Sequence, residues 1–147
     1  MNRIIKTSIV AISVCFGMEA IAAGACNKAS LRGNYNFVVM GSTSGDSEHI
    51  VGRITFNGAG TTSASGVDTY SGITVPIKGN GTYTINTNCE ATGTINWTNG
   101  IKSTYWLYLD DMDVIPATAL AYHGAFAVQN NNGFSASGEI RRVIGKF

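Results

Sequence analysis

Residues 81–109 read GTYTINTNCEATGTINWTNGIKSTYWLYL and carry the clearest strand pattern in the chain. Large apolar residues alternate with small polar ones on both sides of the segment 86–88. Alternation with a period of two is typical of strands that bury one face. Residues 86–88 and 98–100 are rich in Asn, Thr and Gly, which favour tight turns. The stretch therefore predicts three consecutive antiparallel strands, the last of them at residues 101–109.

The same pattern recurs through the rest of the chain after residue 25. Turn signals at residues 57–60 and 130–133 separate the runs, and Pro76 predicts an edge position or a bulge. Residues 61–68 are small and polar, which is compatible with a thin strand or with a loop. Strands are predicted at residues 34–40, 50–56, 70–77, 81–87, 90–97, 101–109, 114–119, 120–129 and 134–144.

The fold class follows from the way these short strands are joined. Consecutive hairpins favour an antiparallel up-and-down meander, which removes its unpaired edges when it closes on itself. We therefore predict an all-β protein whose meander closes into a small barrel of eight or nine strands, with a β-sandwich as the alternative. The length of residues 26–147 suits a single domain.

The first 25 residues have the composition of a cleavable secretory signal. Arg3 and Lys6 precede an apolar stretch of about ten residues, which is too short for a membrane span of roughly twenty. Small residues then allow cleavage after Ala22 or after Ala25. The pattern predicts export to the periplasm or the extracellular space, with no transmembrane segment left after removal of the signal.

Three cysteines are present, and Cys15 would leave with the signal. Cys26 and Cys89 are then the only intramolecular pair, and export favours a disulfide between them. The alternative is a lipid anchor at Cys26 in the outer membrane, because residues 23–26 resemble the bacterial lipobox. Ala23 stands where that motif usually has Leu or another large aliphatic residue.

The charge of the exported part excludes one class of partner. Removing Arg3 and Lys6 from the ten basic residues, and Glu19 from the nine acidic residues, leaves eight of each. A neutral chain without a basic patch lacks the attraction to phosphate on which nucleic-acid binding depends. We therefore expect no nucleic-acid partner.

Four segments resemble a group of small exported bacterial proteins. They are residues 52–60, 79–85 and 89–95, together with an opening formed by Cys26 and residues 30–35. That group is similar to allene-oxide-cyclase-like or lipocalin-like barrels. The resemblance implies a barrel, and it assigns no catalytic residue because its motifs are turn glycines and strand aromatics.

No motif for catalysis or metal binding stands out. The sequence has no Gly-x-Ser-x-Gly elbow, and residues 110–113 lack the spacing of a calcium loop. His49 follows Asp46 and Glu48 in what we interpret as a solvated loop, and Glu139 is the exception in strands otherwise almost free of acids. We assign no catalytic residue, metal site or cofactor, and we favour a function without catalysis.

The aromatic residues suggest a ligand site. Small-molecule pockets are mainly apolar with a few polar groups, and aromatic side chains of a barrel can line one. We therefore predict an exported barrel that binds a small apolar or amphipathic ligand; the alternative is a cell-surface interaction module or pilin-like subunit without a small-molecule ligand. The predicted ligand-binding residues are Tyr35, Phe37, Tyr83, Trp97, Tyr105, Trp106, Tyr108 and His123, with Tyr122 and Phe126 completing the aromatic set.

Overall fold

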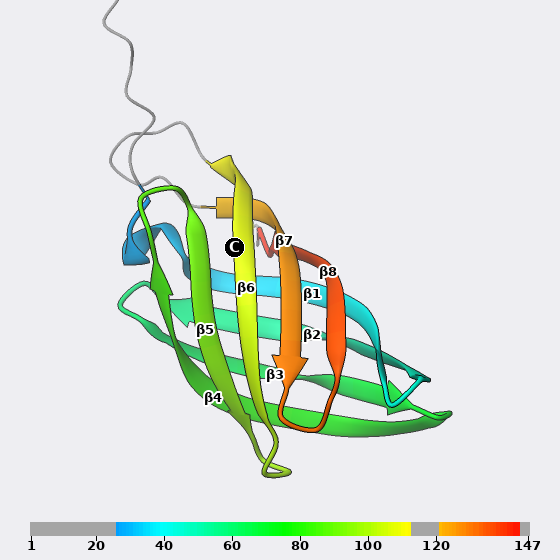
Figure 1. Ribbon diagram of the computed structural model, residues 1–147. Coiled ribbons are helices and arrows are strands. Elements are labelled where there is room, and N and C mark those ends of the chain that lie inside the picture. Colours follow the sequence, from blue (N-terminus) through cyan, green and yellow to red (C-terminus); the bar gives the residue numbers. More distant parts are fainter. Residues whose placement is uncertain (1–25, 113–120, 145–147) are drawn as a thin grey trace, which may run out of the picture.

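The computed structural model describes residues 26–112 and 121–144. The signal segment 1–25 and the strand predicted at residues 114–119 lie outside this part of the chain. Within it, a short 3-10 helix, η1 (Lys28–Ser30), precedes eight strands (Figure 1). They are β1 (Arg32–Thr43), β2 (Asp46–Asn57), β3 (Thr61–Tyr70), β4 (Ile73–Ile85), β5 (Glu90–Trp97), β6 (Lys102–Met112), β7 (Ala121–Asn130) and β8 (Ser135–Arg142).

The eight strands form a closed antiparallel barrel in which every strand pairs with its neighbours in the sequence. The barrel closes where β8 pairs with β1, in a register that runs from Tyr35 opposite Arg142 to Ser42 opposite Ser135. This confirms the predicted all-β meander and gives its strand number as eight within the described residues. The alternative β-sandwich is wrong, because a single sheet closes on itself.

Strand β4 joins two segments that the sequence pattern separates. Residues 73–77 and 81–85 of the two predicted strands belong to one continuous strand, since Gly79 and Gly81 lie within the ladder instead of ending it, whereas Tyr70 belongs to β3. A Cβ atom on Gly81 would overlap the carbonyl oxygen of Thr94 on β5. Glycine therefore lets β5 approach β4 closely at this bend, as glycines do at barrel corners.

Pro76 lies in the part of β4 that extends beyond β5. It pairs with Val67 on β3, whereas the pairing between β4 and β5 runs from Gly79 to Ile85. Proline has no N–H to donate, so it is tolerated where a strand has one free side. The prediction of an edge position is confirmed. Residues 61–68, left open as strand or loop, belong to β3.

Aromatic rings fill the interior of the barrel. Tyr35 packs edge-on against Phe56 at 5.5 Å between ring centroids, and Phe56 packs against Tyr83 at 5.1 Å. Tyr105 makes a similar contact with Phe126 at 5.7 Å. Such edge-to-face pairs contribute roughly 0.5–1.5 kcal/mol beyond the burial of their area. The interior of this barrel is thus a packed core, as expected for a barrel of this strand number.

The two ends of the barrel differ. At one end η1 and the buried Leu31 cover the core, and the hydroxyl of Tyr83 lies 2.9 Å from the carbonyl oxygens of Lys28 and Leu31. We call this the closed end. The opposite end, formed by the β1–β2, β3–β4, β5–β6 and β7–β8 hairpins, is the open end (Figure 1).

A cysteine pair ties the closed end together. Cys26, two residues before the start of η1, lies within bonding distance of Cys89 in the β4–β5 turn, with their Cα atoms 5.0 Å apart. This agrees with the disulfide predicted between them. Among the described residues, the structure contains no helix long and apolar enough to cross a membrane.

Candidate ligand site at the open end of the barrel

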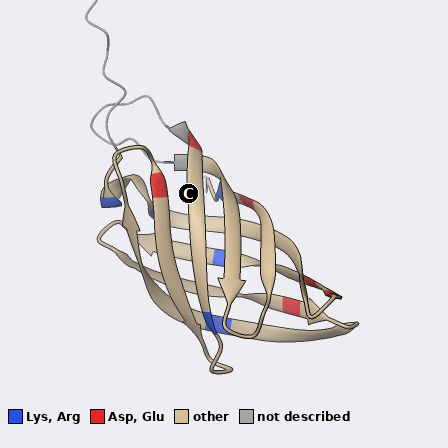
Figure 2. Ribbon diagram, viewed as in Figure 1, with Lys and Arg blue, Asp and Glu red and all other residues tan. Residues whose placement is uncertain are grey.

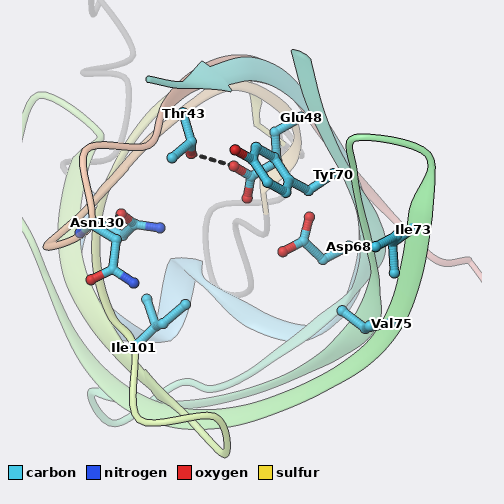
Figure 3. A pocket seen from close by; sticks show the side chains of 9 residues that line it. Thr43, Glu48, Asp68, Tyr70, Ile73, Val75, Ile101 and Asn130 are labelled. Carbon is cyan, nitrogen blue, oxygen red and sulfur yellow. Dashed lines mark hydrogen bonds between the residues drawn. The ribbon is translucent and has the colours of Figure 1, made fainter. Parts of the chain in front are cut away.

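A pocket of about 320 Å³ lies at the open end of the barrel. Its volume falls at the lower limit of the roughly 300–1,000 Å³ common for small-molecule sites. Figure 3 shows its side chains, which come from the strands and turns around the opening. The lining residues are Thr43, Glu48, Asp68, Tyr70, Ile73, Val75, Ile101, Asn130 and Asn132.

Two acidic residues enter this pocket from neighbouring strands. On β2, Glu48 shares the inward face with Ile50 and Ile54, so its side chain points into the barrel and is only 6% exposed. On β3, Asp68 pairs with Ile50 in the ladder and therefore lies diagonally across from Glu48. We call Glu48 and Asp68 the acid pair.

The acid pair is held in a poorly solvated environment. The hydroxyl of Thr43 donates a hydrogen bond to Oε2 of Glu48. Oδ1 of Asp68 is buried and has no hydrogen-bond partner among the described residues. Burial raises the pKa of Asp68 to about 6, and the negative charge of Glu48 adds to this effect.

No positive side chain compensates the acid pair within the pocket. The nine lining residues include no Lys, Arg or His. The ion pairs of His123 with Asp110 and Glu139, and of Arg141 with Glu139, involve none of the lining residues. Figure 2 shows acidic positions on the β1–β2 hairpin and β3 near the open end. The opening therefore presents negative charge beside apolar walls.

The acid pair also lines a second, much smaller void next to the pocket. This void of only about 10 Å³ is shared by Glu48 and Asp68 with Ile50, Ile77, Trp97 and Ile101 among other residues. The core of the barrel is packed. At the rim, the hydroxyl of Tyr70 donates to Oδ2 of Asp46 at 3.0 Å. A ligand that enters here would meet both carboxylates and apolar side chains.

Most of the predicted ligand-binding residues lie elsewhere. Tyr35, Phe37, Tyr83 and Tyr105 are buried in the core, as is Phe126, and Trp97 packs against it. Trp97 also borders the void of about 10 Å³ that the acid pair lines. No ligand contact tests the role of these residues, which stays a prediction.

Two other predicted residues lie on the outer face of β6. Trp106 borders a shallow outer groove with Lys102 and Gln129, and Tyr108 is 54% exposed. Each alternates with a buried residue, so its side chain points away from the core. The side chain of Tyr122 lies outside the part of the chain that the structure describes.

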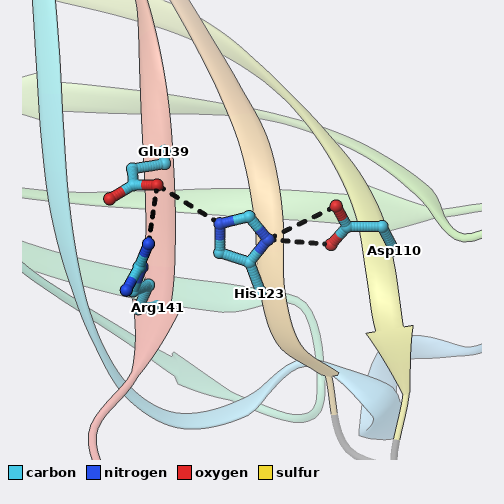
Figure 4. A network of polar contacts seen from close by, with 4 residues as sticks. All are labelled: Asp110, His123, Glu139 and Arg141. Atoms are coloured by element: carbon cyan, nitrogen blue, oxygen red, sulfur yellow. Dashed lines mark hydrogen bonds and ion pairs between the residues drawn. The ribbon is translucent and has the colours of Figure 1, made fainter.

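His123 lies on the outer face of β7, at the centre of a polar network (Figure 4). Its Nδ1 is 3.1 Å from Asp110 on β6, and its Nε2 is 3.3 Å from Glu139 on β8. Arg141 donates to the same Glu139 oxygen at 3.2 Å. The hydrogen bonds from His123 and Arg141 hold the pKa of Glu139 below its usual range. The network connects three strands outside the barrel.

The sequence analysis missed the acid pair. It placed Glu48 in a loop because the strand was predicted to begin at Ile50, and it left the strand that carries Asp68 undecided. The missing signal is the parity of the strands. Counting back by twos from Ile54 reaches Ile50 and Glu48, and counting forward from Ala64 reaches Asp68. If the predicted strands had extended to Glu48 and Asp68, strand parity would have placed both acids inside the barrel.

Solved structures with a similar fold include small designed barrels. A de novo designed fluorescence-activating β-barrel matches with a TM-score of 0.58 and 16% identity, over 80% of this chain and 99% of that one. The redesigned barrel mFAP1, solved bound to DFHBI, matches with a TM-score of 0.55 and 18% identity, over 78% and 97%. The chain shares their fold.

A third solved barrel agrees, and the sequence comparisons add no family. The redesigned barrel b11L5F_LGL has a TM-score of 0.55 and 20% identity, over 80% of this chain and 95% of that one. No family model matches the chain, and no curated protein matches it. The small-barrel part of the predicted resemblance is therefore supported, whereas membership of the exported bacterial group stays a prediction.

Proposed function

We propose that this protein is an exported barrel that binds a small amphipathic molecule at its open end. The observation that carries the proposal is the pocket of about 320 Å³ above the packed core. Apolar side chains from Ile73, Val75 and Ile101 stand beside polar groups of Thr43 and Asn130. This mixture is typical of pockets in which apolar contacts hold a ligand and a few polar groups orient it.

The likeness to designed barrels supports the proposal at the level of the fold. Barrels with this number of strands can hold a small ligand inside or at one end. The redesigned barrel mFAP1 holds DFHBI in its solved structure. For the present chain, the proposed site is defined by its own residues at the open end.

Export is the second part of the proposal. The charged and apolar pattern of residues 1–25 supports a secretory signal, and the pairing of Cys26 with Cys89 is compatible with an oxidising compartment. We place the protein in the periplasm or outside the cell. The pairing of Cys26 with Cys89 favours the disulfide over the lipid anchor, because an acylated Cys26 would have no thiol for a disulfide.

Titration with the neutral fluorophore N-phenyl-1-naphthylamine tests ligand binding. Val75 lines the pocket and Val51 lies on the outer face of β2, and their side chains are similarly exposed at 44% and 46%. We expect Val75→Gln to weaken binding about fivefold or more, because it replaces an apolar wall by an amide. Val51→Gln should have no effect. Equal weakening by both, or no fluorescence increase with the unmodified protein, would contradict the proposed site.

A further inference from the structure

The acid pair gives the proposed site a chemical preference. Glu48 is almost fully buried, and Oδ1 of Asp68 is buried without a hydrogen-bond partner among the described residues. Removing carboxylates from water is unfavourable unless a positive group or hydrogen-bond donors replace the water. Thr43 supplies one donor, to Glu48. The residues that line the pocket around the acid pair include no cation.

The apolar residues of the same pocket come from the part of β4 that pairs with β3 alone and from the end of the β5–β6 turn. Val75 lies opposite Asp68 and Ile73 opposite Tyr70, and Ile101 follows the turn. Ile73 and Val75 are 67% and 44% exposed, whereas Glu48 is 6% exposed. Glu48 therefore lies in a more buried part of the pocket than these two apolar side chains.

We propose that the ligand of this pocket is a small organic cation, with its amine against Glu48 and Asp68 and its hydrocarbon part against Ile73, Val75 and Ile101. This inference rests on the proposed function and names the class of ligand. An ammonium group supplies the missing positive charge and donates up to three hydrogen bonds. Hydrogen bonds from an ammonium group to ionised carboxylates are short and strong. An anionic amphiphile would meet like charge at Glu48 and Asp68 and is disfavoured.

Three probes that share one hydrocarbon chain test the inference: octylamine, 1-octanol and octanoate. Calorimetric titration at pH 8, with backbone amide shifts to locate the site, should give tightest binding for octylamine. We expect its affinity to exceed that of 1-octanol by about tenfold or more, and octanoate to bind weakest. The preference should fall in Glu48→Gln and in Asp68→Asn.

Glu90→Gln is the control for net charge, because Glu90 is exposed at the start of β5 near the closed end. It should leave the preference for octylamine unchanged, and circular dichroism should show that each variant keeps its strands. Equal binding of octylamine and 1-octanol, or a preference that survives both acid-pair variants, would overturn the inference and leave the proposed function standing. If none of the three probes binds, both proposals fail.

Discussion

Gly93 on β5 lies opposite Tyr105 on β6, and the absence of a side chain at Gly93 makes room for the Tyr105 ring. A Cβ atom at residue 93 would overlap Cζ and the hydroxyl of Tyr105, and also the carbonyl oxygen of Thr82 on β4. Tyr105 is fully buried and contacts Phe126, so its ring has little freedom to move aside. The pairing of a small with a large residue thus sets the packing of this part of the barrel.

Gly93→Ala should destabilise the protein. Overpacking a core typically costs 1–3 kcal/mol, and we expect a loss of about 2 kcal/mol in the free energy of unfolding, measured by urea denaturation. In a Tyr105→Leu background the same substitution should cost less, because the two residues are in contact. An unchanged midpoint for the single variant, or full additivity with Tyr105→Leu, would show that the ring does not depend on Gly93.

Asp68→Asn should stabilise the protein at pH 7. The pKa of Asp68 is about 6 in the folded state and about 4 in an unfolded chain, so the folded state holds the proton more tightly. The unmodified protein therefore loses stability as pH rises from about 4 to about 6. After allowance for solvent screening, Asn should raise the free energy of unfolding at pH 7 by about 1–2 kcal/mol.

Urea denaturation of both proteins from pH 3.5 to pH 8 checks this expectation. Other acids titrate in both proteins, so the informative quantity is the difference between their free energies of unfolding at each pH. The difference between Asp68→Asn and the unmodified protein should grow between about pH 4 and about pH 6 and then stay constant. Glu90→Gln provides the matched loss of one carboxylate at an exposed position. A constant difference over the whole range would mean that Asp68 titrates normally.

Removal of the disulfide should cost the protein a large part of its stability. Cys26 and Cys89 are 63 positions apart, for which the chain-entropy model gives about 4 kcal/mol. We expect the Cys26→Ala, Cys89→Ala double variant to unfold at much lower urea concentration than the oxidised protein. Reductant should shift the unmodified protein toward the variant and leave the variant itself unchanged; sensitivity of the variant to reductant would point to another cause.

His123→Ala should raise the pKa of Glu139 toward its usual value. The hydrogen bond from His123 is the main cause of the lowered pKa, and the bond from Arg141 comes second. Titration of the Glu139 carboxyl carbon by NMR measures the change directly. Arg141→Ala is the comparison, and its effect on the pKa should be smaller. A larger effect of Arg141→Ala would mean that the arginine dominates the network.

Secretion of the full chain from a bacterial host tests the export proposal. Mass spectrometry should find a mature protein that begins at Ala23 or Cys26, lighter by two hydrogen atoms than its reduced form. Reduction should restore those hydrogens. An acylated Cys26 would support the lipid anchor in place of the disulfide, whereas an intact Met1 in the cell interior would contradict export.

The fold could be predicted from the sequence where large residues alternate along a strand. Tyr83, Ile95 and Tyr105 mark strands whose inward faces are buried, and the turn signals between them indicate hairpins. Closure between β8 and β1 leaves no local signal, because it pairs segments at opposite ends of the domain. The meander topology made that closure the simplest way to remove two edges.

The candidate site could not be predicted with the same rules. Apolar alternation ends where a barrel opens to solvent, so the strands were predicted too short at the open end: β1 reaches Thr43 and β2 begins at Asp46. Strand β3 is made of small and polar residues and shows no alternation of large side chains. Five of the aromatic residues that suggested a ligand site, Tyr35, Phe37, Tyr83, Tyr105 and Phe126, are instead packed in the core, whereas Trp106 and Tyr108 lie on the outer face.

The even number of strands has a practical consequence for handling this protein. A chain that runs up and down eight times returns to the end from which it started: Cys26 joins the closed end, and Val143, just after β8, donates a backbone hydrogen bond to Asn34 at the start of β1. A tag, a fluorescent protein or a solid support joined before residue 26 or after residue 144 is therefore attached opposite the pocket. Whether the protein is immobilised through the N-terminal or through the C-terminal attachment, the barrel presents its opening to the solution.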